Sequence, residues 1–463
     1  MKQSKRFYRI LAAILIALSL LIFAVMFGAL FLGCSNGGKN SGAGDPKENY
    51  TSFAKTDAFN LRQVITGDSA TSRTVMWQSE TEEKDAFVEY RVLGKAGERP
   101  NAKDNNKKKQ KNENVAAVQS KINTERERIN DKFADNGKTT WVHTVTLQNL
   151  QPGALYEYRL GCGNRRSRWY RLATAQGNTF KALIFPDSQS ANYRAWEDTA
   201  MPAWQRNPDA QFFIVMGDLV DNGEHAYQWN EWFTRIQPMI SQIPAVPLLG
   251  NHETYTMDWK VRMPLAYLHY FQLPEGVPEA YRNQFYSFDY GDVHFAVLNT
   301  QMREMEAFQP DLLKDQIAWF KSDMEKTKKK WKVVLMHKDV LRYGFLTRKT
   351  PREEGFSEEG KTFMPLFDRY GVDVVLTAHL HTYRNRGHIY DYQRNPKGPL
   401  YILTGVAGDV RYPGLWKRHT LDEAMAPQPE TDNYMVMEAE GDILKFSCYL
   451  PDGTKIDETE VRK

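Results

Sequence analysis

The sequence predicts a multidomain chain, with an N-terminal all-β sandwich followed by an α/β layered domain in which a β-sandwich is flanked by helices. Two patterns predict this fold. Apolar and polar residues alternate with period two across residues 59–175, whereas apolar segments of strand length alternate with helical segments from residue 178 to residue 463. The composition, 41% hydrophobic and 25% charged over 463 residues, excludes fibrous and wholly disordered classes.

The formal net charge of +4 is concentrated at the N-terminus. Four of the 61 basic residues lie in the first nine positions, so the rest of the chain carries as many basic as acidic residues. A nucleic-acid-binding protein usually carries a clear basic excess. We therefore do not expect nucleic acid to be a partner.

Residues 1–34 have the pattern of an export signal, because a basic flank precedes an uncharged apolar run over residues 10–33. This run is long enough to cross a bilayer as a helix. Cys34 closes a segment that resembles a bacterial lipobox, with Phe31 where Leu is usual. We expect an extracytoplasmic, membrane-anchored lipoprotein; a single uncleaved N-terminal transmembrane helix is the alternative.

Residues 35–58 are rich in Gly, Ser, Asn and Lys, which is typical of a flexible linker. The β-rich domain predicted over residues 59–175 contains a basic insertion, residues 98–138, that is too polar to bury a core. Val115, Val118, Ile122 and Ile129 have the spacing of a weak amphipathic helix.

Two cysteines, Cys162 and Cys448, remain beyond the leader, and the sequence leaves open whether they pair or stay separate as buried thiols. The segment from Leu150 to Tyr156 resembles the tyrosine corner of fibronectin type III-like domains. That resemblance implies that the Tyr156 hydroxyl bonds back to the preceding turn.

In the second domain, five apolar segments each end in side chains of the types that bind metals. Because open α/β sheets place ligands at the carboxyl ends of their strands, we expect these side chains to gather at one edge. Between two of these segments, a stripe of apolar residues at helical spacing predicts a core-facing helix. The candidate ligands are Asp187, Gln189, Asp218, Asn251, His337, His379 and His381, and the stripe is Leu313, Ile317, Phe320 and Met324.

The order Asp-x-Gln, Gly-Asp, Gly-Asn-His-Glu, His and His-x-His resembles the calcineurin-like metallophosphoesterase superfamily. With the strand-rich domain in front, the chain is similar to the purple acid phosphatase-like branch, and Tyr286–Phe295 resembles a hairpin of that family. The resemblance implies a dinuclear-metal phosphoesterase that hydrolyses small phosphomono- or phosphodiesters. Its cofactors would be two metal ions, among Fe, Mn, Zn and Mg, that supply hydroxide near neutral pH.

The resemblance also implies a role for each ligand. Asp218 would bridge both metals, with Asp187 and His381 on the first metal and Asn251, His337 and His379 on the second. His252 would be the general acid at the leaving-group oxygen, or else a group that orients the site.

The chain departs from the family at several positions. Gln189 stands where His is frequent, and we interpret it as a ligand or near-ligand of the first metal. Asp221 stands where purple enzymes have Tyr, so no iron–tyrosinate bond is expected. Asn222 stands where protein phosphatases have Arg, which argues against a phosphoprotein substrate. Asn222 and Arg342 are candidate substrate-binding residues, and the loops Gln301–Asp311 and Lys338–Glu359 are expected to select the substrate.

Two other functions stay open at this point. Gln189 and the fibronectin-like domain favour a catalytically weak surface binding or adhesion protein with a structural metal site. A nuclease is the third hypothesis, which the neutral body of the chain disfavours.

Overall fold

The structure is a computed structural model that describes residues 51–52, 58–95, 115–119, 121–122, 140–427 and 431–463. The chain divides into two units, Met1–Asn49 and Tyr50–Lys463, and all described residues belong to the second. The predicted leader and most of the predicted linker lie outside the described residues. Within the described part of the chain, no helix combines the length and apolarity needed to cross a membrane.

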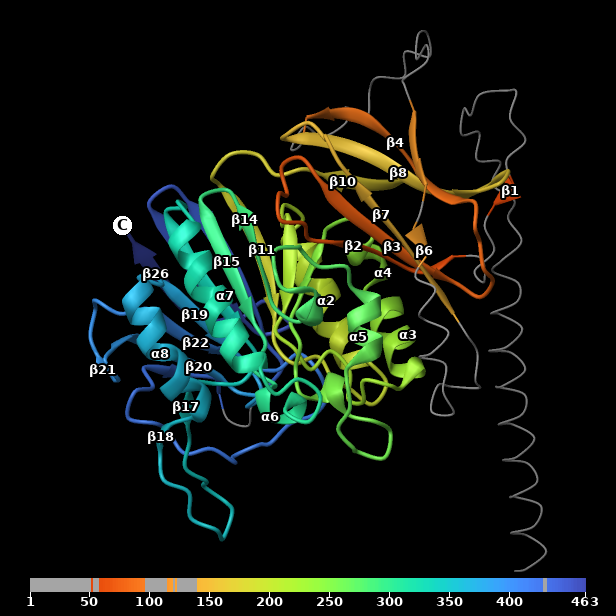
Figure 1. The fold of residues 1–463 in the computed structure, drawn as a ribbon. Helices are drawn as coiled ribbons and strands as arrows, with labels where there is room; N and C mark the ends of the chain where they lie inside the picture. Colours follow the sequence, from red (N-terminus) through yellow and green to blue (C-terminus); the bar gives the residue numbers. More distant parts are fainter. Residues whose placement is uncertain (1–50, 53–57, 96–114, 120, 123–139, 428–430) are drawn as a thin grey trace, which may run out of the picture. The chain divides into compact units, whose positions relative to one another are not determined.

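The N-terminal part is a β-sandwich, as predicted (Figure 1). Its core packs Trp77, Val88, Val145 and Leu160 between two sheets. The tyrosine corner is confirmed, since the Gln151 N–H donates to the Tyr156 hydroxyl at 2.8 Å. One sheet has the order β1-β9-β8-β4-β5, with β10 paired to β8: β1 Thr51–Ser52, β4 Ala86–Lys95, β5 Ala116–Gln119, β8 Ala154–Cys162, β9 Arg165–Arg166 and β10 Tyr170–Ala173.

The predicted amphipathic helix around Val115 to Ile129 is wrong where the structure describes it. Residues Ala116–Gln119 form β5, which pairs antiparallel with Phe87–Tyr90 of β4, and Lys121–Ile122 form β6, which pairs with β7. Pairing with the open sides of β4 and β7 satisfies backbone groups that a helix would leave exposed on the two sheets. This tertiary contact outweighs the weak helical spacing.

The second sheet of the sandwich continues into the next domain. Its order is β26-β25-β24-β11-β12-β13-β2-β3-β7-β6, and the junction is a parallel contact between Ala245 of β13 and Val64 of β2. The strands are β2 Phe59–Val64, β3 Arg73–Ser79, β6 Lys121–Ile122, β7 Trp141–Leu147, β11 Phe180–Phe185, β12 Phe212–Val215, β13 Ala245–Pro247, β24 Tyr434–Glu440, β25 Ile443–Tyr449 and β26 Lys455–Arg462.

A further sheet packs against this long sheet, and helices cover the outer faces of the pair (Figure 1). Its order is β14-β15-β16-β19-β22-β20-β21, and β23 also pairs with β20. Antiparallel β14 and β15 confirm the hairpin expected at Tyr286–Phe295. The strands are β14 Tyr286–Tyr290, β15 Val293–Leu298, β16 Trp331–Met336, β19 Val374–Thr377, β20 Tyr383–Tyr390, β21 Gln393–Arg394, β22 Leu400–Thr404 and β23 Ala424–Met425.

Successive side chains of β16 point to opposite faces of this sheet, and both faces are buried. Val333 and Leu335 belong to the core between the sheets, whereas Val334 and Met336 pack with the helices α7 and α8. The predicted apolar stripe lies on α7, where Phe320 is fully buried. The helices are α2 Arg194–Arg206, α3 Ala226–Arg235, α4 Gln237–Ile240, α5 Leu265–Tyr270, α6 Met302–Met305, α7 Leu312–Lys326 and α8 Glu358–Tyr370.

The two sheets bring several strand ends together. Strands β11, β12 and β13 run parallel to one another, and so do β15, β16, β19 and β22. The turns after β11, β12, β13, β16 and β19 carry all the candidate ligands. Cys162 and Cys448, whose pairing the sequence left open, are both free and buried.

Candidate metal centre

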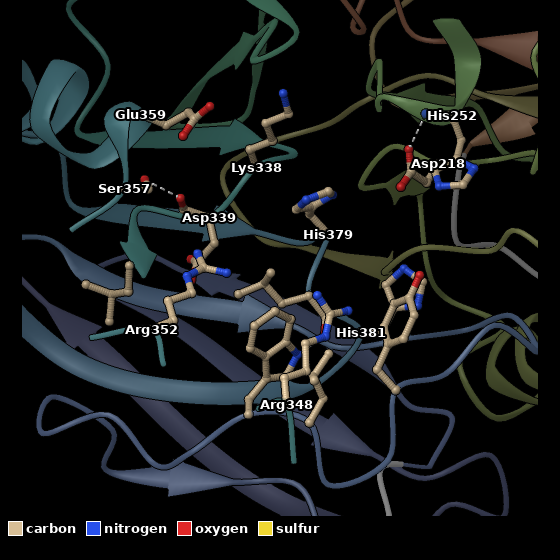
Figure 2. A pocket seen from close by; sticks show the side chains of 15 residues that line it. Asp218, His252, Lys338, Asp339, Arg348, Arg352, Ser357, Glu359, His379 and His381 are labelled. Atoms are coloured by element: carbon tan, nitrogen blue, oxygen red, sulfur yellow. Dashed lines mark hydrogen bonds between the residues drawn. The ribbon is translucent and has the colours of Figure 1, made fainter. Parts of the chain in front are cut away.

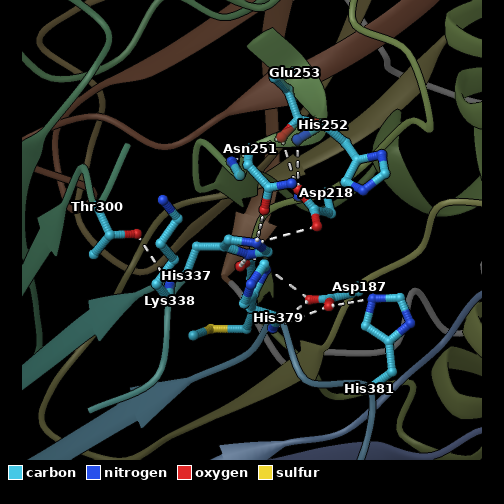
Figure 3. A network of polar contacts seen from close by, with 12 residues as sticks. Asp187, Asp218, Asn251, His252, Glu253, Thr300, His337, Lys338, His379 and His381 are labelled. Carbon is cyan, nitrogen blue, oxygen red and sulfur yellow. Dashed lines mark hydrogen bonds and ion pairs between the residues drawn. The ribbon is translucent and has the colours of Figure 1, made fainter. Parts of the chain in front are cut away.

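Five turns place their polar side chains around one point, as Figure 3 shows. Asp218 lies at the centre of this arrangement. Its Oδ2 is 3.1 Å from His337 Nε2, and its Oδ1 accepts the backbone N–H of His252 at 2.9 Å. Asp187 lies on the other side, where its Oδ2 is 2.9 Å from His381 Nε2.

Glycines make the close approach of these turns possible. A Cβ at Gly250 would lie 2.1 Å from Asp218 Oδ1, and one at Gly217 would lie 2.5 Å from His337 Nδ1. Gly217 also has a positive φ of 94°, which side chains disfavour. Gly250 therefore leaves room for the carboxylate of Asp218, and Gly217 leaves room for the imidazole of His337.

Two groups of metal-ligand atoms meet at Asp218. One consists of Asp218, His337 and His379, the other of Asp187, Asp218 and His381, and within each group the ligand atoms lie within 4.8 Å of one another. Asn251 joins the first group, because its Oδ1 is 3.2 Å from His337 Nε2. The shared carboxylate gives two adjacent sites for cations, as a dinuclear centre needs.

The orientation of two imidazoles fits bound cations. His337 Nδ1–H donates to the Met216 carbonyl at 2.8 Å, and His381 Nδ1–H donates to the Val410 carbonyl at 2.6 Å. Each ring therefore turns Nε2 toward carboxylate or amide oxygens, which are acceptors. A backbone carbonyl on one ring nitrogen fixes the tautomer that leaves the other free to bind a metal.

The pKa values of His337 and Asp218 reflect the negative and positive charges that are close together in this centre. Burial lowers the pKa of His337, but Asp218 and Asp187 outweigh it and raise the pKa to about 9. The neighbouring histidines in turn hold the pKa of Asp218 well below its ordinary value, against the effect of burial. The carboxylates therefore attract positive charge strongly, whether it is a proton or a metal ion.

Buried polar atoms that lack hydrogen-bond partners are a further sign that these residues fit bound metal ions. Both polar side-chain atoms of Gln189 and Nδ1 of His379 are buried and have no hydrogen-bond partner. Such atoms are costly unless a ligand satisfies them. A donor set of carboxylate and amide oxygens with imidazole nitrogens suits Zn, Mn or Fe, so these residues fit a pair of metal ions.

The His-x-His pair differs from the sequence interpretation in one respect. A strand would place His379 and His381 on one face of its pleat, but β19 ends at Thr377, and both residues have positive φ, 75° and 53°. Because of these left-handed backbone conformations, the rings of His379 and His381 point toward different partners. His379 groups with His337, and His381 groups with Asp187.

Glu253 belongs to the Gly-Asn-His-Glu motif, but the sequence alone indicated no role for it. Its fully buried carboxylate accepts backbone N–H groups from Asp218, Leu219, Val220 and Gly250, at 2.7–3.2 Å. Burial, together with the charge of Asp218, raises its pKa to about 7. Glu253 thus joins the turn that carries Asp218 to the turn that carries Asn251.

His252, the predicted general acid, lies beside this centre. Its Nδ1–H donates to the Asp221 carbonyl at 2.8 Å, and Nδ1 is 3.3 Å from the Asp221 carboxylate. Burial opposes the charged ring, yet Asp218 and Asp221 raise its pKa to about 10. The rings of Tyr255 and Trp259 pack edge-on against it.

A cavity of about 280 Å³ opens onto the ligands (Figure 2). Asp218, His252, His379 and His381 line one part of it, and side chains of the 338–359 and 412–416 segments line the rest. Side chains of the segment Lys338–Glu359, which is expected to select the substrate, therefore line the cavity. No residue of Gln301–Asp311 lines this cavity. Glu304, from that loop, contributes only indirectly, because it binds the lining residue Lys338 at 2.7 Å.

Neither predicted substrate-binding residue lines this cavity. Asn222 Nδ2–H donates to the Thr256 carbonyl at 3.0 Å and braces a turn. Arg342 donates to the Glu353 carbonyl at 3.1 Å. The arginines that do line the cavity are Arg348 and Arg352, which the sequence interpretation included only as part of a loop.

Comparisons with known proteins agree with this architecture. Residues 182–383 match the calcineurin-like phosphoesterase family, and residues 59–174 match the N-terminal domain of purple acid phosphatase. Acid phosphatase type 7 of Mus musculus is 27% identical over 60% of this chain and 67% of its own length. Purple acid phosphatase 23 of Arabidopsis thaliana is 24% identical over 58% of this chain and 63% of its own length.

Solved structures show the same fold. Purple acid phosphatase PPD1 from yellow lupin seeds superposes with a TM-score of 0.68 at 18% identity, covering 88% of this chain and 74% of its own. PhoD superposes with a TM-score of 0.58 at 13% identity, covering 89% and 94%.

The fold, the ligand cluster and these matches are those of a calcineurin-like phosphoesterase domain over residues 182–383. Within that class, the chain combines a calcineurin-like metallophosphoesterase domain with a purple acid phosphatase N-terminal domain, and its homologues are acid and purple acid phosphatases. The family and fold expected from the sequence are thereby confirmed.

Proposed function

We propose that this chain hydrolyses phosphomono- or phosphodiesters of small molecules at a dinuclear metal centre built on Asp218. The observation that carries the proposal is the carboxylate of Asp218, which two groups of potential metal ligands share. Asp187, Gln189 and His381 would hold one ion, and Asn251, His337 and His379 the other, with Asp218 common to both. When bound, such a pair of cations neutralises phosphate charge and makes water nucleophilic near neutral pH.

The chain's own residues supply orientation and a proton. Gly217 and Gly250 let the two turns close on Asp218, and Glu253 holds them there. His252 is the proposed general acid: Asp221 fixes its Nδ1 side, so Nε2 is the nitrogen left to protonate the departing oxygen. Asp221 occupies the position where purple enzymes have a tyrosine ligand, so we expect no purple colour.

Elemental analysis with a phosphoester panel tests the proposal. We expect two metal ions per chain and turnover of an aryl phosphate, with both lost in Asp218→Asn. Arg303→Gln is a matched control, because Arg303 pairs with Glu358 outside the cavity. Two bound ions without hydrolysis of any phosphomono- or phosphodiester would instead favour the binding or adhesion protein that Gln189 suggests.

We also propose that the protein is extracytoplasmic and anchored to a membrane by its N-terminal segment. The support is the sequence pattern of residues 1–34 alone. Mass spectrometry of the N-terminus tests it: a chain that begins at a lipid-modified Cys34 is expected. An intact N-terminus that starts at Met1 and stays in the membrane fraction would favour the uncleaved helix.

A further inference from the structure

A short loop and a distant segment form one wall of the cavity above the metal ligands. The loop lies between β17 (Leu341–Arg342) and β18 (Gly355–Phe356), and the segment is residues 412–417. The Leu346 N–H donates to the Leu415 carbonyl at 2.8 Å, and the Lys417 N–H donates to the Gly344 carbonyl at 3.0 Å. These backbone bonds hold the two pieces together as one wall.

Aromatic rings connect this wall to the metal ligands. Phe345 stacks on Trp416, with ring centroids 5.5 Å apart and planes 27° from parallel. The Trp416 indole N–H donates to the Leu380 carbonyl at 2.9 Å, and Leu380 stands between His379 and His381 in the chain. The aromatic stack is therefore tied directly to the turn that carries two ligands, which fixes its distance from the centre.

The stack carries two guanidinium groups on its faces. Arg348 lies over the Phe345 ring at 4.7 Å, and Arg352 lies over Phe345 at 5.2 Å and Trp416 at 5.6 Å. Cation–π contacts of this kind orient a guanidinium without neutralising its charge. Both arginines line the cavity, which also contains Asp218, His252 and both histidines of the pair (Figure 2).

Neither guanidinium forms an ion pair with a carboxylate in the part of the chain that the structure describes. Burial lowers the pKa of Arg352, and repulsion from Arg342 and Arg348 lowers it further. Two other charged residues that line the cavity are paired: Lys338 binds Glu304 at 2.7 Å, and Asp339 binds Arg386 at 2.6 Å. Glu359 also lines the cavity, but within the described residues it forms no ion pair with Arg348 or Arg352.

Arg348 and Arg352 have no carboxylate partner among the described residues and line a cavity that ends at the candidate metal centre. Their positive charges therefore form a second site that attracts anions. We propose that Arg348 and Arg352 form a distal anion subsite, so that the preferred substrate is a phosphate ester carrying a second anionic group, such as a further phosphate, on the same molecule. This inference rests on the proposed function, which places the scissile phosphate at the metal ligands. Arginine suits the role because its planar fork binds phosphate oxygens in pairs.

The test compares substrates that differ only in the second anion. The full metal-loaded chain is given α,ω-alkanediol bisphosphates of three to eight carbons and the matching alkanediol monophosphates. We expect one chain length at which kcat/KM for the bisphosphate exceeds that for the monophosphate by roughly tenfold or more, the factor expected of a charge-assisted hydrogen-bonded pair. In Arg348→Gln and Arg352→Gln this ratio should fall toward one.

Arg369→Gln is the control, since Arg369 lies over Tyr370 and outside the cavity; the ratio should stay as in the wild type. An equal loss for both substrates in the Arg348 and Arg352 variants would overturn the inference, because it would mean that these residues hold the scissile phosphate. A wild-type ratio near one at every length would also overturn it.

A binding measurement separates this inference from the proposed function. Calorimetry with alkane-α,ω-bisphosphonates and the matching monophosphonates, which are not hydrolysed, needs no turnover. If no ester is hydrolysed but the bisphosphonate binds roughly tenfold tighter in an Arg348-dependent way, the hydrolytic function is wrong and the subsite stands. If both phosphonates bind equally, the subsite is wrong whatever the activity.

Discussion

Substitution of Glu253 by Gln tests whether one buried carboxylate holds the metal centre together. Glu253 Oε1 accepts the Leu219 and Val220 N–H groups, and Oε2 accepts those of Asp218 and Gly250. Glutamine has the same shape but only one acceptor oxygen, so its amide nitrogen would face two buried N–H donors. At about 1–3 kcal/mol for each unsatisfied donor, we expect the free energy of unfolding to fall by about 2–6 kcal/mol.

The same substitution should weaken metal binding, because the two displaced turns carry Asp218 and Asn251. Supporting groups of this kind typically contribute about 10–100-fold to metal affinity. Denaturant unfolding of the chelator-treated chain measures the first effect, and competition with a metal indicator measures the second. Glu231→Gln is the control, since Glu231 makes a partly exposed ion pair with Arg235 worth about 1 kcal/mol or less. Unchanged stability and metal affinity in Glu253→Gln would refute the reasoning.

Three further predictions address the ligands, the general acid and the pH dependence of stability. Asp218→Asn should lower metal affinity and kcat by more than the roughly 100-fold expected of a supporting group, measured by metal titration and aryl phosphate hydrolysis; retention of both ions would contradict the shared role. His252→Gln should slow an alkyl phosphate by about 10²–10⁴-fold and a nitrophenyl phosphate less, since the nitrophenolate needs little protonation; equal losses would contradict the role of acid. Burial lowers the pKa of His294, but the hydrogen bonds that its ring donates to Asp289 and Asp323 outweigh burial and raise the pKa to about 9. The resulting stabilisation, up to about 3 kcal/mol, is complete below pH ~6.5 and disappears as the pH rises through about 9. Denaturant unfolding at pH 6 and pH 10 should therefore show a large effect of His294→Gln only at pH 6.

Much of the centre could be predicted from the sequence because its parts are local. Asp187 and Asp218 follow the paired parallel strands β11 and β12, so they had to lie at one edge of that sheet if the strands paired. His337 follows β16 of the other sheet, and the packing of the two sheets brings it to them. The cavity-lining residues outside these turns could not be predicted in the same way. Arg342, in β17, and Arg348, in the following loop, lie close together in the sequence, and nothing in their spacing reveals which of the two lines the cavity.

The division into two domains could also be predicted only in part. The change from period-two alternation to mixed elements near residue 175 is visible in the sequence, but the pairing of β2 with β13 is not. That contact rests on the backbone, where Ile65 N–H donates to the Ala245 carbonyl at 3.1 Å, and backbone hydrogen bonds leave little trace in residue type. Similarly, the strands at Ala116–Gln119 and Lys121–Ile122 form because the edges of β4 and β7 are available, which no local pattern records.

The joined sheet has a consequence for the metal centre. Strand β13 precedes the turn that carries Asn251 and His252, and β2 pairs with one edge of it while β12 pairs with the other. Without β2, β13 would be a three-residue edge strand, and its backbone on that side would be open to water. The N-terminal sandwich therefore acts on the centre through main-chain pairing. A ligand turn held on both sides can keep Asn251 next to His337 even though its strand is short.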